Sequence, residues 1–154
     1  MKRYIGDVSK EDRTKFARTI YAMVTVACVK QEDLCVEFKE FLEGRELALI
    51  TTAPADSVEP ILVKLNCENL FKIVYKSETA AEPDKKELFK AFIAKHGKPE
   101  YYIGDGDKNL AVAKELDIKT ISVNWVKKAE IKGDFDVQSV SELKDVLSQS
   151  EDKK

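Results

Sequence analysis

The sequence predicts an α/β fold in which a Rossmann-like parallel sheet of about five strands is flanked by helices. Two observations support this prediction. From residue 45 onward, short apolar runs typical of strands alternate with amphipathic stretches typical of helices. Polar residues of the turn-forming kind stand where these runs end. The predicted strands cover residues 47–51, 72–75, 101–104, 120–123 and 134–137.

Apolar residues at helical spacing predict the flanking helices, which cover residues 57–65, 88–96, 110–116 and 139–147. The polar tail 148–154 is expected to fray. Nearer the N-terminus, residues 32–42 predict a helix that ends at Gly44 as its C-cap. Residues 10–29 fit one long helix, but the β-branched residues within 21–29 also fit a strand. Periodicity does not decide between the two.

Length and composition limit the class of protein. A chain of 154 residues is expected to form one domain over residues 1–154, with a core large enough to need no disulfide or structural metal. Lys and Arg (26) nearly balance Asp and Glu (28), which disfavours nucleic acid as a partner. No apolar run approaches the roughly 20 residues of a membrane span, and no apolar signal core follows Met1. The cysteines Cys28, Cys35 and Cys67 lack CxxC spacing and are expected to be reduced, buried thiols of a cytoplasmic protein.

The candidate functional residues stand at predicted strand ends, where open α/β sheets bind their ligands. The first predicted strand is followed by Thr51 and Thr52, and the third by Gly-Asp-Gly-Asp-Lys-Asn at residues 104–109. A strand at the N-terminus would be followed by Asp7. Phosphoryl transfer needs an in-line nucleophile, a cation and fixed hydrogen-bond donors, and these residue types supply them.

At these positions the chain resembles the haloacid dehalogenase-like hydrolase superfamily, whose members are mostly phosphatases that use an aspartate nucleophile and Mg²⁺. The resemblance covers residues 32–148, and the order and spacing of the motifs are more specific than any single motif. It implies that residues 10–44 form a reduced helical cap. The motifs are Leu49-Ile50-Thr51-Thr52, Leu62-Val63-Lys64-Leu65, the run 70–78, Pro83-Asp84 before Glu87-Leu88-Phe89, the turn Tyr102-Ile103-Gly104-Asp105-Gly106, and the closing segment 135–147.

The resemblance implies roles for several of these residues. Thr51 matches the phosphate-binding Thr or Ser, with Thr52 and Gly106 as further substrate-binding residues. Asp105 matches the first metal-binding acid of the family's Gly-Asp loop.

Other positions depart from the family pattern. Asn109 stands where the loop usually has its second acid, and Asp107 nearby is a further candidate metal ligand. Glu82 stands where the family has a Lys before Pro-Asp. Lys85 and Lys86, in the helical turn that follows, are therefore the candidate catalytic lysines.

Asp7 is the candidate nucleophile, because residues 4–9 are the nearest match to the family's Asp-x-Asp-x-Thr motif. Ser9 would then occupy the position of the acid/base Asp, and Mg²⁺ would be shared between Asp7 and Asp105. The alternative is that residues 22–29 form the first strand and that the chain has no catalytic Asp. Two function classes follow. One is a Mg²⁺-dependent phosphatase of a small phosphorylated molecule, and the other is a catalytically impaired domain of the same type that acts as a binding or regulatory module.

Overall fold

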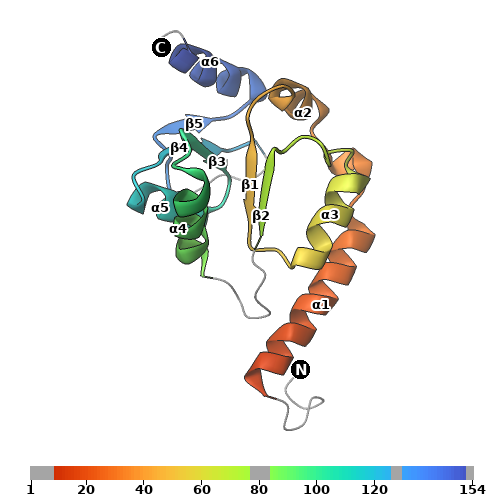
Figure 1. Ribbon diagram of the computed structural model, residues 1–154. Coiled ribbons are helices and arrows are strands. Elements are labelled where there is room, and N and C mark those ends of the chain that lie inside the picture. Colours follow the sequence, from red (N-terminus) through yellow and green to blue (C-terminus); the bar gives the residue numbers. More distant parts are fainter. Residues whose placement is uncertain (1–8, 77–83, 126–129, 152–154) are drawn as a thin grey trace. The chain divides into compact units, whose positions relative to one another are not determined.

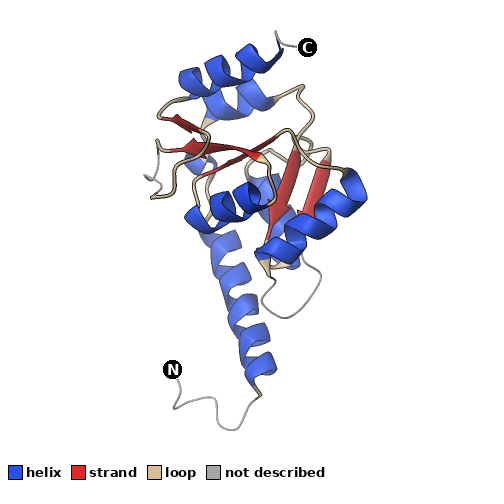
Figure 2. Ribbon diagram, turned by 90° about the vertical axis from the view of Figure 1, so that its left-hand side faces the viewer, coloured by secondary structure: helices blue, strands red, loops and turns tan. Residues whose placement is uncertain are grey.

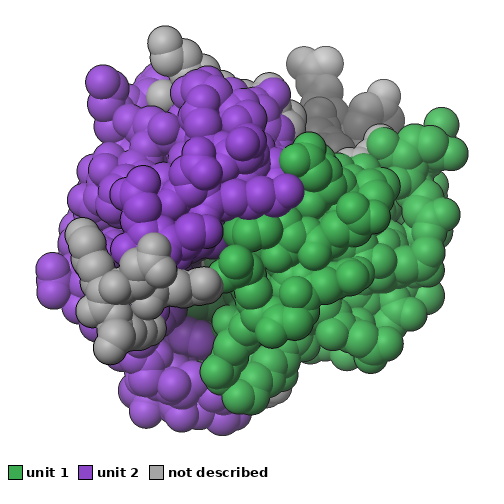
Figure 3. All heavy atoms as spheres, turned by 90° about the horizontal axis from the view of Figure 1, so that it is seen from above, with its two compact units in different colours: residues 1–84 green, residues 85–154 purple. Residues whose placement is uncertain are grey.

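The computed structural model of the protein describes residues 9–76, 84–125 and 130–151. The chain divides into two compact units, residues 1–84 and residues 85–154 (Figure 3). Among the described residues, no helix is both long enough and apolar enough to cross a membrane. The expectation of a single domain over residues 1–154 stays a prediction.

Unit 1 contains a two-stranded parallel sheet and its helices (Figures 1 and 2). Strands β1 and β2 pair in register from Ala48 opposite Ile73 to Thr51 opposite Lys76. Parallel strands need a crossover connection, and helix α3 lies in the segment that connects them. The described elements are α1 (Lys10–Cys28), the 3-10 turn η1 (Gln31–Asp33), α2 (Val36–Leu42), β1 (Ala48–Thr51), α3 (Ala55–Lys64) and β2 (Ile73–Lys76).

The core of unit 1 forms around α3. Val58, Leu62 and Cys67 are buried there, and partly buried side chains pack against them, namely Leu34, Leu49, Ala53, Leu65, Leu70, Phe71 and Val74. All three cysteines are free of disulfides, but only Cys67 is buried. The expectation of buried thiols is therefore wrong for Cys28 and Cys35, which lie outside this core at the end of α1 and just before α2.

Helix α1 settles the choice that the sequence left open, because residues 10–28 are helical throughout. The alternative strand over 22–29 is wrong. Beta-branched residues cost a helix only a few tenths of a kcal/mol each, which tertiary packing overrides. Here α1 packs beside α3, Ala22 is buried, and Lys64 of α3 donates a hydrogen bond to the Val26 carbonyl in the last turn of α1. Several other apolar side chains of α1 remain exposed: Phe16, Ile20, Tyr21, Met23 and Val24.

The helix predicted over 32–42 is shorter than expected. It begins at Val36, after η1 and the extended residue Cys35. Leu34 packs against the core of unit 1, which requires the chain to turn before the helix starts. Just beyond α2, Gly44 adopts a φ of +81°, a left-handed conformation that favours glycine after a helix.

Unit 2 contains a three-stranded parallel sheet in the order β3-β4-β5. Leu110, Ile121, Val137 and Leu143, from four different elements, are almost wholly buried and form its centre. Its elements are α4 (Lys85–His96), β3 (Tyr101–Gly104), α5 (Asp107–Glu115), β4 (Lys119–Val123), β5 (Phe135–Val137) and α6 (Val140–Glu151).

The α/β prediction is confirmed, and each of the five described strands lies where an apolar run predicts one. They pair as two separate parallel sheets, one in each unit, rather than as one continuous ladder. Helix α6 continues to Glu151, so part of the tail expected to fray is helical. The predicted N-terminal strand at residues 4–5 lies outside the described residues.

Candidate functional site

The first part of the candidate site is the Thr51 loop, residues 51–54, which connects β1 to α3. Thr51 is half-buried, and its hydroxyl oxygen accepts a hydrogen bond from the Ala53 backbone N–H at 3.1 Å. The buried Ser57 fixes the other end of the loop, because its hydroxyl donates to the Pro54 carbonyl at 2.7 Å. Within the described part of the chain, the hydroxyl hydrogen of Thr51 has no acceptor. Thr51 is thus held in place with one donor available to a ligand.

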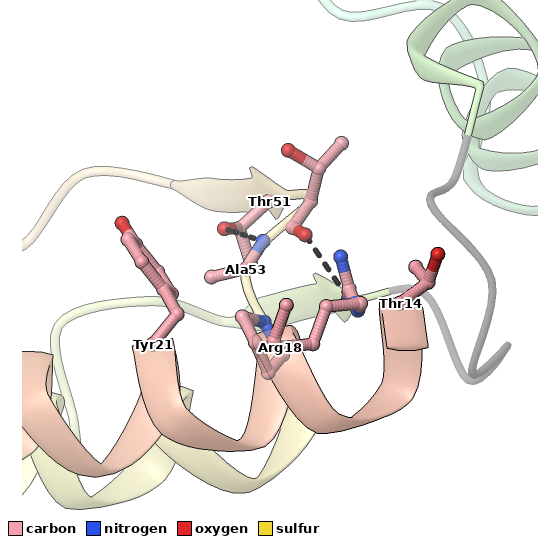
Figure 4. Close-up of a pocket in the computed structure, with 8 residues that line it drawn as sticks. Thr14, Arg18, Tyr21, Thr51 and Ala53 are labelled. Carbon is pink, nitrogen blue, oxygen red and sulfur yellow. Dashed lines mark hydrogen bonds between the residues drawn. The ribbon is translucent and has the colours of Figure 1, made fainter. Parts of the chain in front are cut away.

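A pocket of about 600 Å³ lies between this loop and α1 (Figure 4). Cavities of this size commonly hold small molecules. Arg18 of α1 reaches toward the loop, and its Nη2 donates to the Thr52 carbonyl at 3.4 Å. Of the described residues that line the pocket, Arg18 alone is charged: they are Thr14, Ala17, Arg18, Tyr21, Thr51, Thr52, Ala53 and Pro54.

The second part of the candidate site is the Asp105 loop, residues 104–109, which connects β3 to α5. Asp105 is exposed directly after the strand, and no hydrogen bond or ion pair engages its carboxylate within the described ranges. Asp107 begins α5, and its Oδ1 accepts a hydrogen bond from the Ile131 backbone N–H at 2.7 Å. The two carboxylates therefore differ in availability, since one is open to a ligand and the other holds a loop.

Tyr102 contacts two residues of this loop, Gly104 and Asn109. Burial raises the pKa of its phenol, a hydrogen bond from the Asn109 side chain lowers it, and the charge of Asp105 raises it again. A Cβ atom on Gly104 would lie 2.5 Å from the Tyr102 hydroxyl oxygen, so glycine is needed there. The side chain of Asn109 is thus engaged with a tyrosine inside its own unit.

The donor set of the Asp105 loop fits Mg²⁺ chemically. Mg²⁺ prefers carboxylate and water oxygens, and one or two protein carboxylates are enough to hold it. Asp105 offers such a carboxylate, whereas one oxygen of Asp107 is already occupied. Among the residues that the structure describes, no three His, Cys, Asp or Glu side chains gather around a common point. The predicted partner Asp7 lies outside those residues.

The candidate lysines differ in their surroundings. Lys86 forms an ion pair with Glu115 of α5 at 2.6 Å, which fixes it on the surface between α4 and α5. Lys85 is the half-buried first residue of α4, and no ion pair is found for it in the described ranges. Glu82, like Asp7, lies outside the described residues.

The two loops lie in different units, and a common cleft for Thr51 and Asp105 stays a prediction. Sequence reasoning missed two cations near the Thr51 loop. Lys76 ends β2 opposite Thr51 and pairs with Glu59 at 3.1 Å, and its place at a strand end was a usable signal. Arg18 left no signal, since its position depends on α1 being a helix.

Comparisons with known proteins agree with this architecture. The sequence model of the haloacid dehalogenase-like hydrolase family matches residues 4–123. No curated protein matches the chain.

Three solved structures share the fold at low sequence identity. A candidate phosphatase from Clostridium difficile is 22% identical with a TM-score of 0.61, and the match covers 71% of this chain and 58% of the phosphatase. A haloacid dehalogenase-like family protein from Streptococcus pneumoniae is 17% identical with a TM-score of 0.60, covering 72% and 56%. A predicted phosphoglycolate phosphatase from Haemophilus somnus is 20% identical with a TM-score of 0.59, covering 72% and 54%. The chain thus spans little more than half the length of these proteins. The family match extends over most of the sequence, and the chain belongs to the haloacid dehalogenase-like hydrolase family.

Proposed function

We propose that the protein is a Mg²⁺-dependent phosphatase that acts on a small phosphorylated molecule through Asp7 as the nucleophile. The family match carries this proposal, because residues 4–123 include Asp7, Thr51 and Asp105. The open donor of Thr51 and the open carboxylate of Asp105 support it, since Thr51 is the last residue of β1 and Asp105 lies directly after β3.

Each residue has a defined task in this proposal. The Asp7 carboxylate attacks phosphorus in line with the leaving oxygen, and water then hydrolyses the aspartyl-phosphate. Thr51 donates its hydroxyl hydrogen to a phosphoryl oxygen, together with backbone N–H groups at the start of α3. Asp105 and Asp7 would hold Mg²⁺, which neutralises phosphate charge when bound. We favour Lys85 over Lys86 as the lysine of the site, because Lys86 would first have to leave Glu115.

Two further points belong to this proposal. The helices within residues 10–44, α1 and α2, form the reduced cap. The three free cysteines support a cytoplasmic location, where thiols stay reduced.

Hydrolysis of p-nitrophenyl phosphate tests the proposed function. We expect slow turnover that requires Mg²⁺, stops on chelation with EDTA and is lost in Asp7→Asn. Asp145→Asn on the exposed surface of α6 removes the same charge and should keep the activity. A folded protein with intact Mg²⁺ binding and no turnover would instead favour a binding or regulatory module.

Thr51 allows a test on the described part of the site. Thr51→Val removes the donor and should lower turnover at least about tenfold, the value of one hydrogen bond to a charged group. Thr51→Ser keeps the hydroxyl and should keep most of the activity. Thr19→Val is the matched control, because the exposed Thr19 hydroxyl donates to the Lys15 carbonyl within α1 and lies outside the pocket lining that the structure describes. Equal activity in Thr51→Val and Thr51→Ser would contradict the assigned role.

A further inference from the structure

We propose that the pocket between α1 and the Thr51 loop binds a second anionic group of the substrate, a carboxylate or a second phosphate, through the guanidinium of Arg18. This inference rests on the proposed function, which places the transferred phosphoryl group at Thr51. It narrows the substrate class to small molecules that carry two anionic groups.

The geometry places Arg18 and Thr51 in the same pocket (Figure 4). The Arg18 side chain is half-buried, and among the described residues it makes one hydrogen bond, from its Nη2 to the Thr52 carbonyl. A guanidinium has five N–H donors, so most of them remain available for a ligand. A planar fork of this kind matches the oxygens of a carboxylate or phosphate.

The charges around Arg18 favour an anion. Among the described residues no Asp or Glu lines the pocket, and no acid lies one helical turn from Arg18, where residues 14, 15, 21 and 22 are Thr, Lys, Tyr and Ala. In the described part of the chain Arg18 has no acidic partner. A half-buried cation without a counter-ion leaves positive charge at the pocket wall, and an anionic ligand group would neutralise it.

A purely structural role does not account for the position of Arg18 as well as anion binding does. A donor-to-acceptor distance of 3.4 Å is longer than the usual 2.7–3.2 Å of N–H···O hydrogen bonds, so this bond holds the loop only weakly. Ser57 and Ala53 already fix the loop from within, through shorter bonds to Pro54 and Thr51. The guanidinium is thus near the loop without being needed to shape it.

Calorimetric binding to the full chain, with Mg²⁺ and Asp7→Asn to prevent turnover, tests the inference directly. Phosphoglycolate is compared with ethyl phosphate, which lacks the carboxylate, and fructose 1,6-bisphosphate with fructose 6-phosphate, which lacks the second phosphate. At least one doubly anionic probe should bind about tenfold or more tightly than its counterpart, the value of a charge-assisted hydrogen bond. The pair that shows the preference identifies the anionic group. A chain that prefers neither probe would overturn the proposal.

Arg18→Gln should then reduce the preference to less than about twofold, and Arg18→Lys should restore part of it, because lysine keeps the charge without the fork. Arg13→Gln is the matched control, since Arg13 is an exposed arginine of the same helix that does not line the pocket. It changes the net charge equally and should leave the preference intact. A preference that survives Arg18→Gln, or that disappears equally in Arg13→Gln, would overturn the assignment.

Kinetics separate this inference from the proposed function. For this test Asp7 is left intact. The ratio of kcat/KM between the two members of the preferred pair should be at least about tenfold lower in Arg18→Gln than in the unsubstituted chain. Turnover of every probe without any Arg18-dependent ratio would refute the second anion site and leave the phosphatase intact. Binding that depends on Arg18 without any turnover would refute the phosphatase and leave the anion site intact.

Discussion

Asp107 accepts a hydrogen bond from the backbone N–H of Ile131 at 2.7 Å, across 24 residues of sequence. This contact ties the start of α5 to the segment between β4 and β5. Asp105, two residues earlier, is exposed and has no such contact in the described ranges. The two acids of this short loop therefore differ in role: Asp107 holds the loop in place, and Asp105 is open to a ligand.

We predict that Mg²⁺ affinity depends on Asp105 far more than on Asp107. Asp105→Asn removes the open carboxylate and should weaken Mg²⁺ binding at least about tenfold in isothermal titration. Asp107→Asn retains an oxygen acceptor for Ile131 and should change the affinity less than about twofold. Equal losses in the two variants would show that both acids bind the ion.

The structural task of Asp107 is measured by a different substitution. Asp107→Ala leaves the half-buried Ile131 N–H without its acceptor and should lower the free energy of unfolding in urea by about 1–3 kcal/mol. Asp105→Ala serves as the control in the same loop and should cost much less. The opposite order of stability would contradict the tasks given to the two acids.

Gly104 and Tyr102 approach each other too closely for any larger residue at position 104. An added Cβ would lie 2.5 Å from the Tyr102 hydroxyl oxygen and 2.9 Å from two ring carbons. The ring has little room to move, since it packs edge-on against Phe89 at 5.4 Å between centroids.

Gly104→Ala should therefore destabilise the protein by about 1–3 kcal/mol in urea unfolding, the usual cost of overpacking. Gly106→Ala is the matched control, because its nearest neighbour would be the Asn109 side chain at an ordinary 3.7 Å. In the background of Tyr102→Phe the cost of Gly104→Ala should shrink without vanishing, since the ring carbons remain. An undiminished cost would mean that Tyr102 is not the obstacle.

The strands were predictable because their signal is local. The apolar run Tyr101–Gly104 is closed by its own glycine, and the predicted bounds match the structure. Helix α1 was not decidable, since Thr25 and Val26 suit a strand locally, while the burial of Ala22 and packing beside α3 favour the helix. Local propensity yields to tertiary contacts at such positions.

The same division holds for the candidate site. Thr51 ends β1 and Asp105 directly follows β3, so a sequence pattern was enough to select them. The hydrogen bond between Asp107 and Ile131 joins residues that are 24 positions apart in the sequence. The hydrogen bond between Arg18 and Thr52 joins residues that are 34 positions apart. Such contacts arise from packing and leave no pattern in the sequence around either partner.

Asp134 makes the stability of unit 2 depend on acid pH. The backbone N–H of Thr120 is the largest cause that lowers the pKa of its carboxyl, and the Thr120 hydroxyl and Lys114 lower it further, against a smaller rise from desolvation. Both Thr120 donors bind Oδ2, at 2.7 and 2.9 Å. A folded pKa below the unfolded one stabilises the protein above about pH 4, and this contribution is lost as pH falls through the folded value.

We expect the free energy of unfolding to fall more steeply between pH 5 and pH 2, roughly the titration range of carboxyls, in the unsubstituted chain than in Asp134→Asn. At pH 7 the variant should be less stable by about 1 kcal/mol, because a neutral amide accepts weaker hydrogen bonds. Asp145→Asn removes an exposed acid of α6 as the control and should keep the steep fall. Parallel pH curves for the unsubstituted chain and Asp134→Asn would contradict this assignment.

Ser9 is the N-cap of α1, and we expect it to occupy the position of the family's acid/base Asp. Its Oγ accepts the Asp12 N–H at 3.1 Å and donates to the Asp12 carboxylate at 2.6 Å. An Asp at position 9 caps a helix as well as Ser does, but it would place a second carboxylate against Asp12. The acid is therefore best restored together with Asp12→Asn, which removes the repulsion.

The double variant Ser9→Asp with Asp12→Asn should hydrolyse p-nitrophenyl phosphate faster than Asp12→Asn alone. A general acid/base contributes about 10²–10⁴-fold in favourable geometry, so a rise of at least about tenfold is expected. Ser9→Asn with Asp12→Asn is the matched control, because Asn caps the helix without supplying a base. A rise in the rate confined to the Asp variant would indicate that residue 9 activates the hydrolytic water and that Asp7 is the nucleophile. If both variants stay equally slow while Mg²⁺ binding and helix content are intact, Asp7 is not the nucleophile, because a neighbouring base would have accelerated hydrolysis of its acyl phosphate.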